Sequence, residues 1–183
     1  MSFDLDRFIA DLRAARGERS RQALREVVAR AVSEPAALLN RIGAPEKAAV
    51  QVLHHAPDLT VLNVVWAPKQ VTFPHDHRMG AVIGMYGGRE DNVYWKRVSG
   101  SARKFEIAPA GGEAVGDGDT IILGPDIIHS VINPLDKISG AIHVYDGAFL
   151  TTARSMWNAE TLREEPYDVS VAVKGMPLQT AAR

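Results

Sequence analysis

The sequence of 183 residues contains no cysteine. This absence excludes disulfides, thiolate metal ligands and a cysteine nucleophile, so any metal must be held by His, Asp or Glu. The chain also lacks an excess of charge of one sign, with 21 Lys and Arg against 22 Asp and Glu. Because a balanced charge gives little attraction to nucleic acid or anionic lipid, we expect a small-molecule partner rather than nucleic acid or a membrane.

Long apolar runs are missing as well. No stretch reaches the roughly 18 apolar residues that a membrane helix needs. The segment from Met1 to Arg7 has acidic residues where a secretory signal needs a basic region and then an apolar run. We therefore expect a cytoplasmic protein. Its length suits a single domain, residues 1–183, that can bury one core without a structural metal.

Residues 1–49 show apolar side chains at helical spacing and are predicted to form a helical N-terminal extension. In the second of three segments, Leu24, Val27, Val28 and Ala31 follow helical periodicity after Ser20, a suitable N-cap. The third segment has Ser33 as a possible cap, Pro35 in the first turn and Gly43 at the end. We expect these helices to pack on a barrel.

Residues 50–150 change to short stretches rich in Val, Ile, Thr, Tyr and Trp, separated by Gly, Pro and Asp. Glycine pairs such as Gly87-Gly88 and Gly111-Gly112 are predicted to supply turns. This pattern predicts a mainly β jelly-roll barrel. The tail, 151–183, is less clear, with a possible short helix over 153–162. The predicted strands are Thr60–Trp66, Val71–His77, Ala81–Tyr86, Asn92–Val98, Lys104–Ile107, Thr120–Leu123, His129–Ile132 and Ala141–Tyr145.

The stretch Pro74-His75-Asp76-His77-Arg78 carries the first sign of chemistry. Alternate residues of a strand project to the same face, so the imidazoles of His75 and His77 can bind one metal together. An isolated His-x-His fits two ordinary polar strand residues equally well. A second motif is needed to decide.

That motif is the segment from Gly118 to Asn133, which places His129 eleven residues after Gly118 and four before Asn133. The spacing resembles the second motif of the cupin superfamily, and His75 and His77 resemble the first. Gly124-Pro125-Asp126 stands where that family has proline, any residue and glycine, which we interpret as the same turn. The resemblance implies a double-stranded β-helix, the cupin jelly roll, with His75, His77 and His129 as metal ligands.

The cupin glutamate that follows His-x-His is missing, because Ala81 and Val82 occupy its positions. Glu90 lies further along at a spacing that does not match, so we expect a solvated turn residue and leave it out of the site. Three neutral imidazoles leave the 2+ charge of a metal uncompensated and at least one coordination position open. An anionic ligand such as a substrate thiolate would satisfy that metal, next to dioxygen.

The stretch from Ala141 to Tyr145 places His143 and Tyr145 on one strand face. It resembles the Ser-x-His-x-Tyr segment of cysteine dioxygenase-like enzymes, with Ala141 in place of the serine. The resemblance spans roughly Leu62 to Leu150. It implies Fe(II) as cofactor, oxidation of a small mercapto acid or amino thiol to its sulfinic acid with O2, and catalytic roles for Tyr145 and His143. Without the serine, we expect His143 to be oriented by water or backbone.

The residue that binds the substrate carboxylate is less evident. The family's arginine lies before His-x-His, in a stretch where this chain has none. Arg78, Arg89, Arg97 and Arg154 are possible bidentate partners, and we favour Arg78 as the substrate-binding residue. Two other activities stay open: a three-histidine cupin that cleaves a carbon–carbon bond of a diketone, and a Zn(II)-binding or non-catalytic cupin.

Overall fold

The computed structural model describes residues 2–17, 20–98, 107–169 and 178–180, the last range by its backbone alone. Three helices come first: α1 (Leu5–Gly17), α2 (Arg21–Val32) and α3 (Pro35–Ile42). Short strands make up most of the rest. They are β1 (Ala49–His55), β2 (Thr60–Trp66), β3 (His75–Asp76), β4 (Ala81–Gly87), β5 (Arg89–Arg97), β6 (Ile107–Gly116), β7 (Thr120–Leu123), β8 (Ile128–Ile132), β9 (Ser139–Tyr145), β10 (Ser155–Trp157), β11 (Glu164–Pro166) and β12 (Leu178–Thr180).

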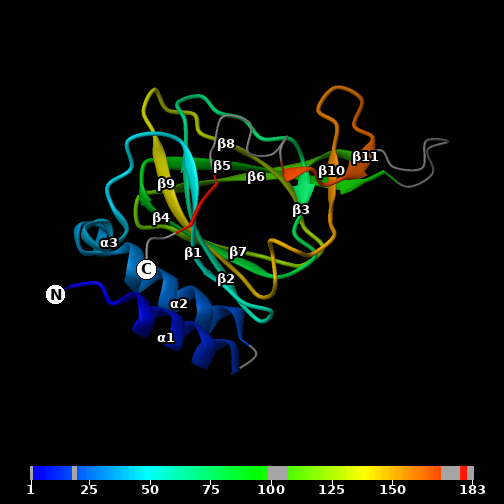
Figure 1. Cartoon of the computed structure of the whole chain (residues 1–183). Coiled ribbons are helices and arrows are strands. Elements are labelled where there is room, and N and C mark those ends of the chain that lie inside the picture. Colours follow the sequence, from blue (N-terminus) through cyan, green and yellow to red (C-terminus); the bar gives the residue numbers. More distant parts are fainter. Residues whose placement is uncertain (1, 18–19, 99–106, 170–177, 181–183) are drawn as a thin grey trace.

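The strands form two six-stranded sheets that face each other across the barrel interior (Figure 1). One sheet has the order β12-β1-β2-β9-β4-β7 and the other β11-β10-β3-β8-β5-β6. Neighbouring strands are antiparallel except for β1 and β12, which are parallel. The predicted fold is confirmed: a mainly β jelly-roll barrel with helices at its N-terminal end.

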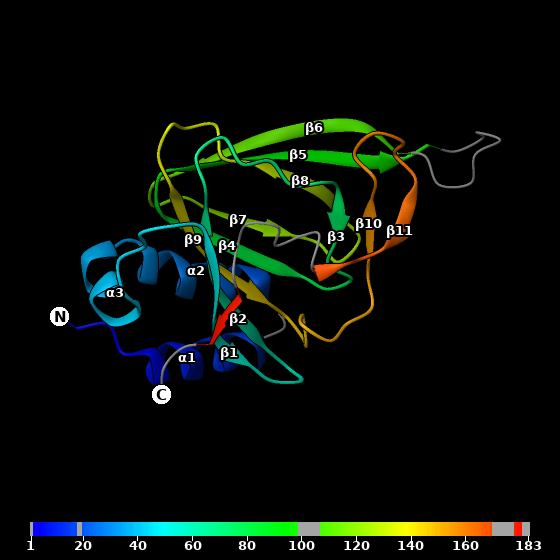
Figure 2. The ribbon, with the colours of Figure 1, turned by 45° about the horizontal axis from the view of Figure 1, so that its top comes forward.

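The helices cover the outer face of the first sheet (Figure 2). Helix α2 begins at the predicted cap, where the Ser20 hydroxyl accepts a hydrogen bond from the Ala23 backbone N–H at 3.4 Å. It lies so close to β4 that a Cβ added to Gly84 would stand 2.5 Å from Val28, so only glycine fits this crossing. None of the described helices is long and apolar enough to cross a membrane.

Strand β2 is buried along its whole length because each of its faces packs against a different layer. Leu62 and Val64 point into the barrel, whereas Val61 packs against the helices. Burial of a Val or Leu side chain stabilises a fold by about 1.5–3 kcal/mol, so these two apolar clusters hold the helices and the sheets together. The mostly apolar sequence of β2, interrupted by the buried Asn63, follows from this double burial.

Several expectations need correction. The predicted helix over 153–162 is wrong, because β10 pairs with β3 and β11 there and extends the second sheet. Gly111-Gly112 lies within β6, directly after a bulge at Ala110, and forms no turn. Ser33 ends α2, while Glu34 precedes α3. Strand β1 was not predicted, and the predicted strand Lys104–Ile107 lies outside the described residues except for its last position.

Candidate metal centre

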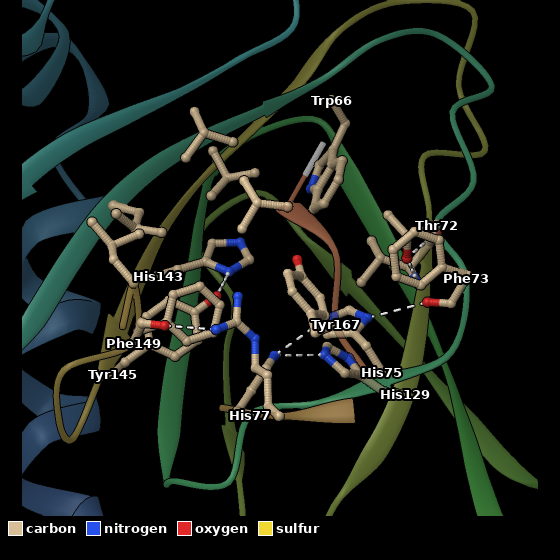
Figure 3. Close-up of a pocket in the computed structure, with 17 residues that line it drawn as sticks. Trp66, Thr72, Phe73, His75, His77, His129, His143, Tyr145, Phe149 and Tyr167 are labelled. Atoms are coloured by element: carbon tan, nitrogen blue, oxygen red, sulfur yellow. Dashed lines mark hydrogen bonds between the residues drawn. The ribbon is translucent and has the colours of Figure 1, made fainter. Parts of the chain in front are cut away.

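The register between β3 and β8 brings the two histidine motifs together. His75 of β3 pairs with His129 of β8, and His77 follows β3 by one residue. The His77 Nε2 atom lies 3.3 Å from His75 Nε2 and 3.1 Å from His129 Nε2. Figure 3 shows the three imidazoles facing one another at the wall of a pocket. One candidate ligand atom from each lies within 4.8 Å of the other two.

This spacing fits a single metal ion. Two nitrogens bound at about 2.0–2.1 Å from a metal stand roughly 2.8–3.4 Å apart at angles between octahedral and tetrahedral. Two of the three imidazole rings are also oriented by hydrogen bonds at Nδ1, the nitrogen that faces away from the other histidines. His75 Nδ1 lies 3.1 Å from the Phe73 carbonyl, and His129 Nδ1 lies 2.7 Å from Asn92 Oδ1. Since both acceptors are oxygens, each Nδ1 carries the hydrogen and each Nε2 keeps its lone pair for a metal.

Burial keeps the three imidazoles neutral. The pKa of His75 is lowered to about 4, mainly by burial; the nearby Arg154 and His143 contribute to this decrease, and the Phe73 hydrogen bond opposes it. Burial also holds the pKa values of His77 and His129 well below the usual range, with the neighbouring histidines adding to the effect. A neutral imidazole is the form that binds metal, so this site is ready to bind one at neutral pH.

The pocket beside the histidines is mostly apolar. Among the described residues that line it, no side chain is Asp or Glu, and Arg154 is the one arginine or lysine. Such a pocket suits a small organic anion. The lining residues are Val50, Leu62, Val64, Trp66, Thr72, Phe73, His75, His77, His129, Val131, His143, Tyr145, Phe149, Leu150, Arg154, Tyr167 and Val169.

Arg154 is held between two aromatic rings. Its guanidinium carbon lies 4.0 Å from the Phe149 ring centroid and 3.8 Å from that of Tyr167. One terminal nitrogen donates to the Phe149 carbonyl at 2.7 Å, while the buried Nε has no hydrogen-bond partner among the described residues. Stacking fixes the plane of the guanidinium, and the unpaired Nε–H leaves a donor for an anion.

Arg78, the arginine favoured from sequence, does not line this pocket. Its side chain is about half exposed and pairs with Asp76 at 2.8 Å. Arg89 pairs with Asp91, and Arg97 pairs with Glu164. Of the four arginines considered, the structure brings only Arg154 to the histidines.

His143 and Tyr145 both line the pocket, as Figure 3 shows. The Tyr145 hydroxyl lies 3.1 Å from His143 Nδ1, and the Tyr145 ring packs edge-on against His77 at 5.0 Å between centroids. Burial raises the pKa of Tyr145, so its hydroxyl keeps its proton at neutral pH. The pair can therefore hold a proton beside the three histidines.

Glu90 corrects the expectation of a solvated turn residue. It belongs to β5 and is completely buried. Its carboxylate accepts hydrogen bonds from Trp66 Nε1 at 2.8 Å and from Asn92 Nδ2 at 3.2 Å, and lies 3.6 Å from His143 Nε2. Burial raises the pKa of Glu90, but His143, Trp66 and Asn92 outweigh burial and bring it below the usual value. The His143 ring thus faces a carboxylate on the side away from Tyr145.

No family model matches the chain. Solved structures of similar shape include a single-residue variant of Bacillus subtilis oxalate decarboxylase (17% identity, 51% of this chain and 22% of that chain, TM-score 0.40). Another is a conserved Streptococcus pyogenes protein of unknown function (14% identity, 52% and 70% coverage, TM-score 0.41). This chain therefore spans about a fifth of the decarboxylase chain.

Proposed function

We propose that this protein is an Fe(II)-dependent dioxygenase that oxidises a small mercapto acid to its sulfinic acid. The observation that carries the proposal is the meeting of three elements in one pocket: three neutral histidines, a buried arginine and a histidine–tyrosine pair. When bound at His75, His77 and His129, Fe(II) would supply open coordination positions for a thiolate and dioxygen.

The reaction balances without a further reductant. Both atoms of dioxygen are transferred to the sulfur of the thiolate, giving a sulfinate. Sulfur loses four electrons and dioxygen gains four. The product keeps the single negative charge of the thiolate. The protein therefore has to position the thiolate and dioxygen and to donate hydrogen bonds, but it supplies no electrons.

Arg154 is the proposed partner of the substrate carboxylate. Its unpaired Nε–H and its stacking between Phe149 and Tyr167 present a fixed guanidinium edge inside the pocket. No acidic side chain lines the described part of the pocket to pair with an ammonium group. We therefore expect mercapto acids such as 3-mercaptopropionate or mercaptosuccinate to be better substrates than cysteine or cysteamine.

Tyr145 is the proposed donor of a hydrogen bond to dioxygen or substrate, and His143 orients its hydroxyl. The apolar walls around them exclude water, which strengthens each polar contact made inside the pocket. In this arrangement the proton stays on Tyr145 Oη or moves to His143 Nδ1, 3.1 Å away.

A metal enzyme of another activity is the second candidate. The mostly apolar pocket also suits the carbon skeleton of a diketone, whose enolate would bind through two oxygens, and three histidines suit Zn(II) as well as iron. A metal enzyme of another activity requires only the three histidines and the fold. It requires no particular role for Tyr145 or Arg154.

Metal analysis of protein purified without oxygen separates these candidates. It is followed by oxygen uptake with 3-mercaptopropionate, mercaptosuccinate, cysteine and cysteamine, and by detection of the sulfinate. Iron near one per chain with thiol-dependent uptake supports the proposal. Zinc, or iron without thiol-dependent uptake, overturns it in favour of the second candidate.

A further inference from the structure

The buried carboxylate of Glu90 connects to both halves of the site through polar contacts. On one side, Asn92 donates to Glu90 Oε1 at 3.2 Å and holds His129 Nδ1 at 2.7 Å with its own Oδ1. On the other side, Glu90 Oε2 lies 3.6 Å from His143 Nε2, and His143 Nδ1 contacts the Tyr145 hydroxyl at 3.1 Å. All the residues in this series of contacts are buried.

A carboxylate can only accept hydrogen bonds, which fixes the direction of each contact. Asn92 must turn its Nδ2 hydrogens toward Glu90, so its Oδ1 must face His129. That oxygen in turn requires a hydrogen on His129 Nδ1 and leaves the lone pair on Nε2. His129 Nε2 is the atom that faces His77 across 3.1 Å.

The same rule acts on His143. Its buried Nε2 has no hydrogen-bond partner among the described residues, and the Glu90 carboxylate lies 3.6 Å from it. A negative charge there favours a hydrogen on Nε2, which leaves Nδ1 to accept from the Tyr145 hydroxyl. Glu90 of β5 thus faces His143 of β9 from the opposite sheet.

We propose that Glu90 is a positioning residue that sets the tautomers of His129 and His143, and thereby presents His129 Nε2 to the metal and His143 Nδ1 to Tyr145. The inference rests on the proposed metal centre but not on the identity of the substrate. It makes Glu90, Asn92 and His129 a directional series of hydrogen bonds that ends at the metal.

Glu90→Gln tests this series because glutamine has the same shape but offers a donor at one of its two positions. If the oxygen of the introduced glutamine keeps the contact with Trp66, its amide nitrogen faces the Asn92 nitrogen, donor against donor. Asn92 then turns over and directs its nitrogen at His129, which favours the tautomer with a hydrogen on Nε2. Loss of such an outer hydrogen bond typically lowers metal affinity about 10- to 100-fold.

The rescue variant is Glu90→Gln combined with Asn92→Asp. The introduced glutamine can then donate to the introduced aspartate, whose second oxygen accepts from His129 Nδ1. The direction of the series is thus restored, with the negative charge moved to the neighbouring side chain. A role in packing alone predicts no such recovery. Because the double variant restores the net charge of the wild type, a role of charge alone is distinguished by the histidine tautomers, which it would leave unchanged in Glu90→Gln. Glu113→Gln is the matched control, because the exposed Glu113 loses the same charge and contacts Tyr94 instead of the site.

The experiment measures Co(II) affinity by chelator competition and records the histidine tautomers of metal-free protein by nitrogen NMR at pH 8. We expect Glu90→Gln to bind Co(II) about 10- to 100-fold more weakly, the double variant to recover most of that loss, and Glu113→Gln to match the wild type. In the wild type, His129 should carry its hydrogen on Nδ1 and His143 on Nε2.

Unchanged Co(II) affinity in Glu90→Gln, or a wild-type His129 with its hydrogen on Nε2, overturns the proposal. The wild-type tautomers are read without metal and without substrate, so they test the role of Glu90 even if Glu90→Gln fails to fold. Failure of the wild type to bind Co(II) would instead contradict the metal centre. Failure to oxidise thiols, with the tautomers as expected, would contradict only the proposed reaction.

Discussion

Asp76, the residue between the two histidines of the first motif, accepts a hydrogen bond from the backbone N–H of Ser155 at 2.8 Å. Ser155 begins β10 directly after Arg154. One buried carboxylate thus links the strand that carries His75 to the segment that carries the arginine of the pocket. The same carboxylate pairs with Arg78 at 2.8 Å, which explains why that arginine lies outside the pocket.

Asp76→Ala should therefore loosen the position of Arg154. Removing the acceptor leaves a backbone N–H without its partner, and we expect a loss of about 1–3 kcal/mol in the free energy of unfolding. The KM for a mercapto acid should rise as well. Asp91→Ala is the control, because Asp91 pairs with the exposed Arg89 and should cost less than about 1 kcal/mol. Equal stability of the two variants in urea unfolding would contradict this link.

Arg154→Gln should weaken binding of the substrate carboxylate without removing the metal. Loss of a hydrogen bond to a charged group costs about 1.5–3 kcal/mol, which corresponds to a KM for 3-mercaptopropionate about 10- to 100-fold higher. The kinetics with 2-mercaptoethanol, which has no carboxylate, should change much less. Arg78→Gln is the matched control and should leave KM near the wild-type value. The opposite ranking would return the role to Arg78.

Parts of this structure could be predicted because their signals are local. The apolar periodicity and Ser20 cap define α2, and β2 and β7 have the predicted bounds. The two histidine motifs are short, and the pairing of β3 with β8 places them together as the resemblance to cupins implied. Asn133 of the second motif accepts from the Leu135 backbone N–H and the Ser139 hydroxyl, which fixes the loop between β8 and β9.

Arg154 and Glu90 show what the sequence could not predict. The place of Arg154 depends on β10 joining the second sheet beside β3, a pairing between residues about 80 positions apart. Arg78 has a positive φ of 56°, so the backbone turns just after His77. Glu90 looks like a turn residue beside Gly87-Gly88, yet it lies on β5 and is buried. The positions of these two side chains in the folded protein depend on tertiary packing, which the local spacing of residues in the sequence does not encode.

The stability of the metal-free protein should fall in mild acid. The pKa of His75 is about 4 in the folded chain, below its ordinary value of about 6.5, and those of His77 and His129 are also lowered by burial. At a pH between the folded-state pKa and the ordinary pKa of these histidines, the unfolded chain binds protons that the folded chain does not. The free energy of unfolding should therefore decrease from about pH 6.5 downward, by up to about 1.4 kcal/mol per pH unit for each histidine.

Urea unfolding of metal-free protein at several pH values between about 7.5 and 4.5 measures this slope. His129→Gln removes one of the three groups and should make the slope shallower, whereas replacing the partly buried His54, which lies outside the site, should change it much less. A bound metal should add a second loss in acid, because protons compete for the same Nε2 atoms. An identical slope in wild type and His129→Gln would show that the buried histidines do not govern the acid response.

Tyr145→Phe should keep the metal and lose most of the turnover. The Tyr145 ring packs against Phe149 at 3.7 Å and against His77, and phenylalanine preserves both contacts while removing the hydroxyl that meets His143. Loss of a positioned proton donor typically lowers turnover about 10²- to 10⁴-fold. Because burial raises the pKa of Tyr145, the hydroxyl stays protonated and the loss of turnover should be the same between about pH 6 and 9.

Tyr94→Phe, which removes a hydroxyl bound to Glu113 near the surface, is the matched control. Anaerobic metal analysis with oxygen uptake on the same preparation distinguishes lost chemistry from lost metal, and full activity in Tyr145→Phe would remove Tyr145 from the mechanism.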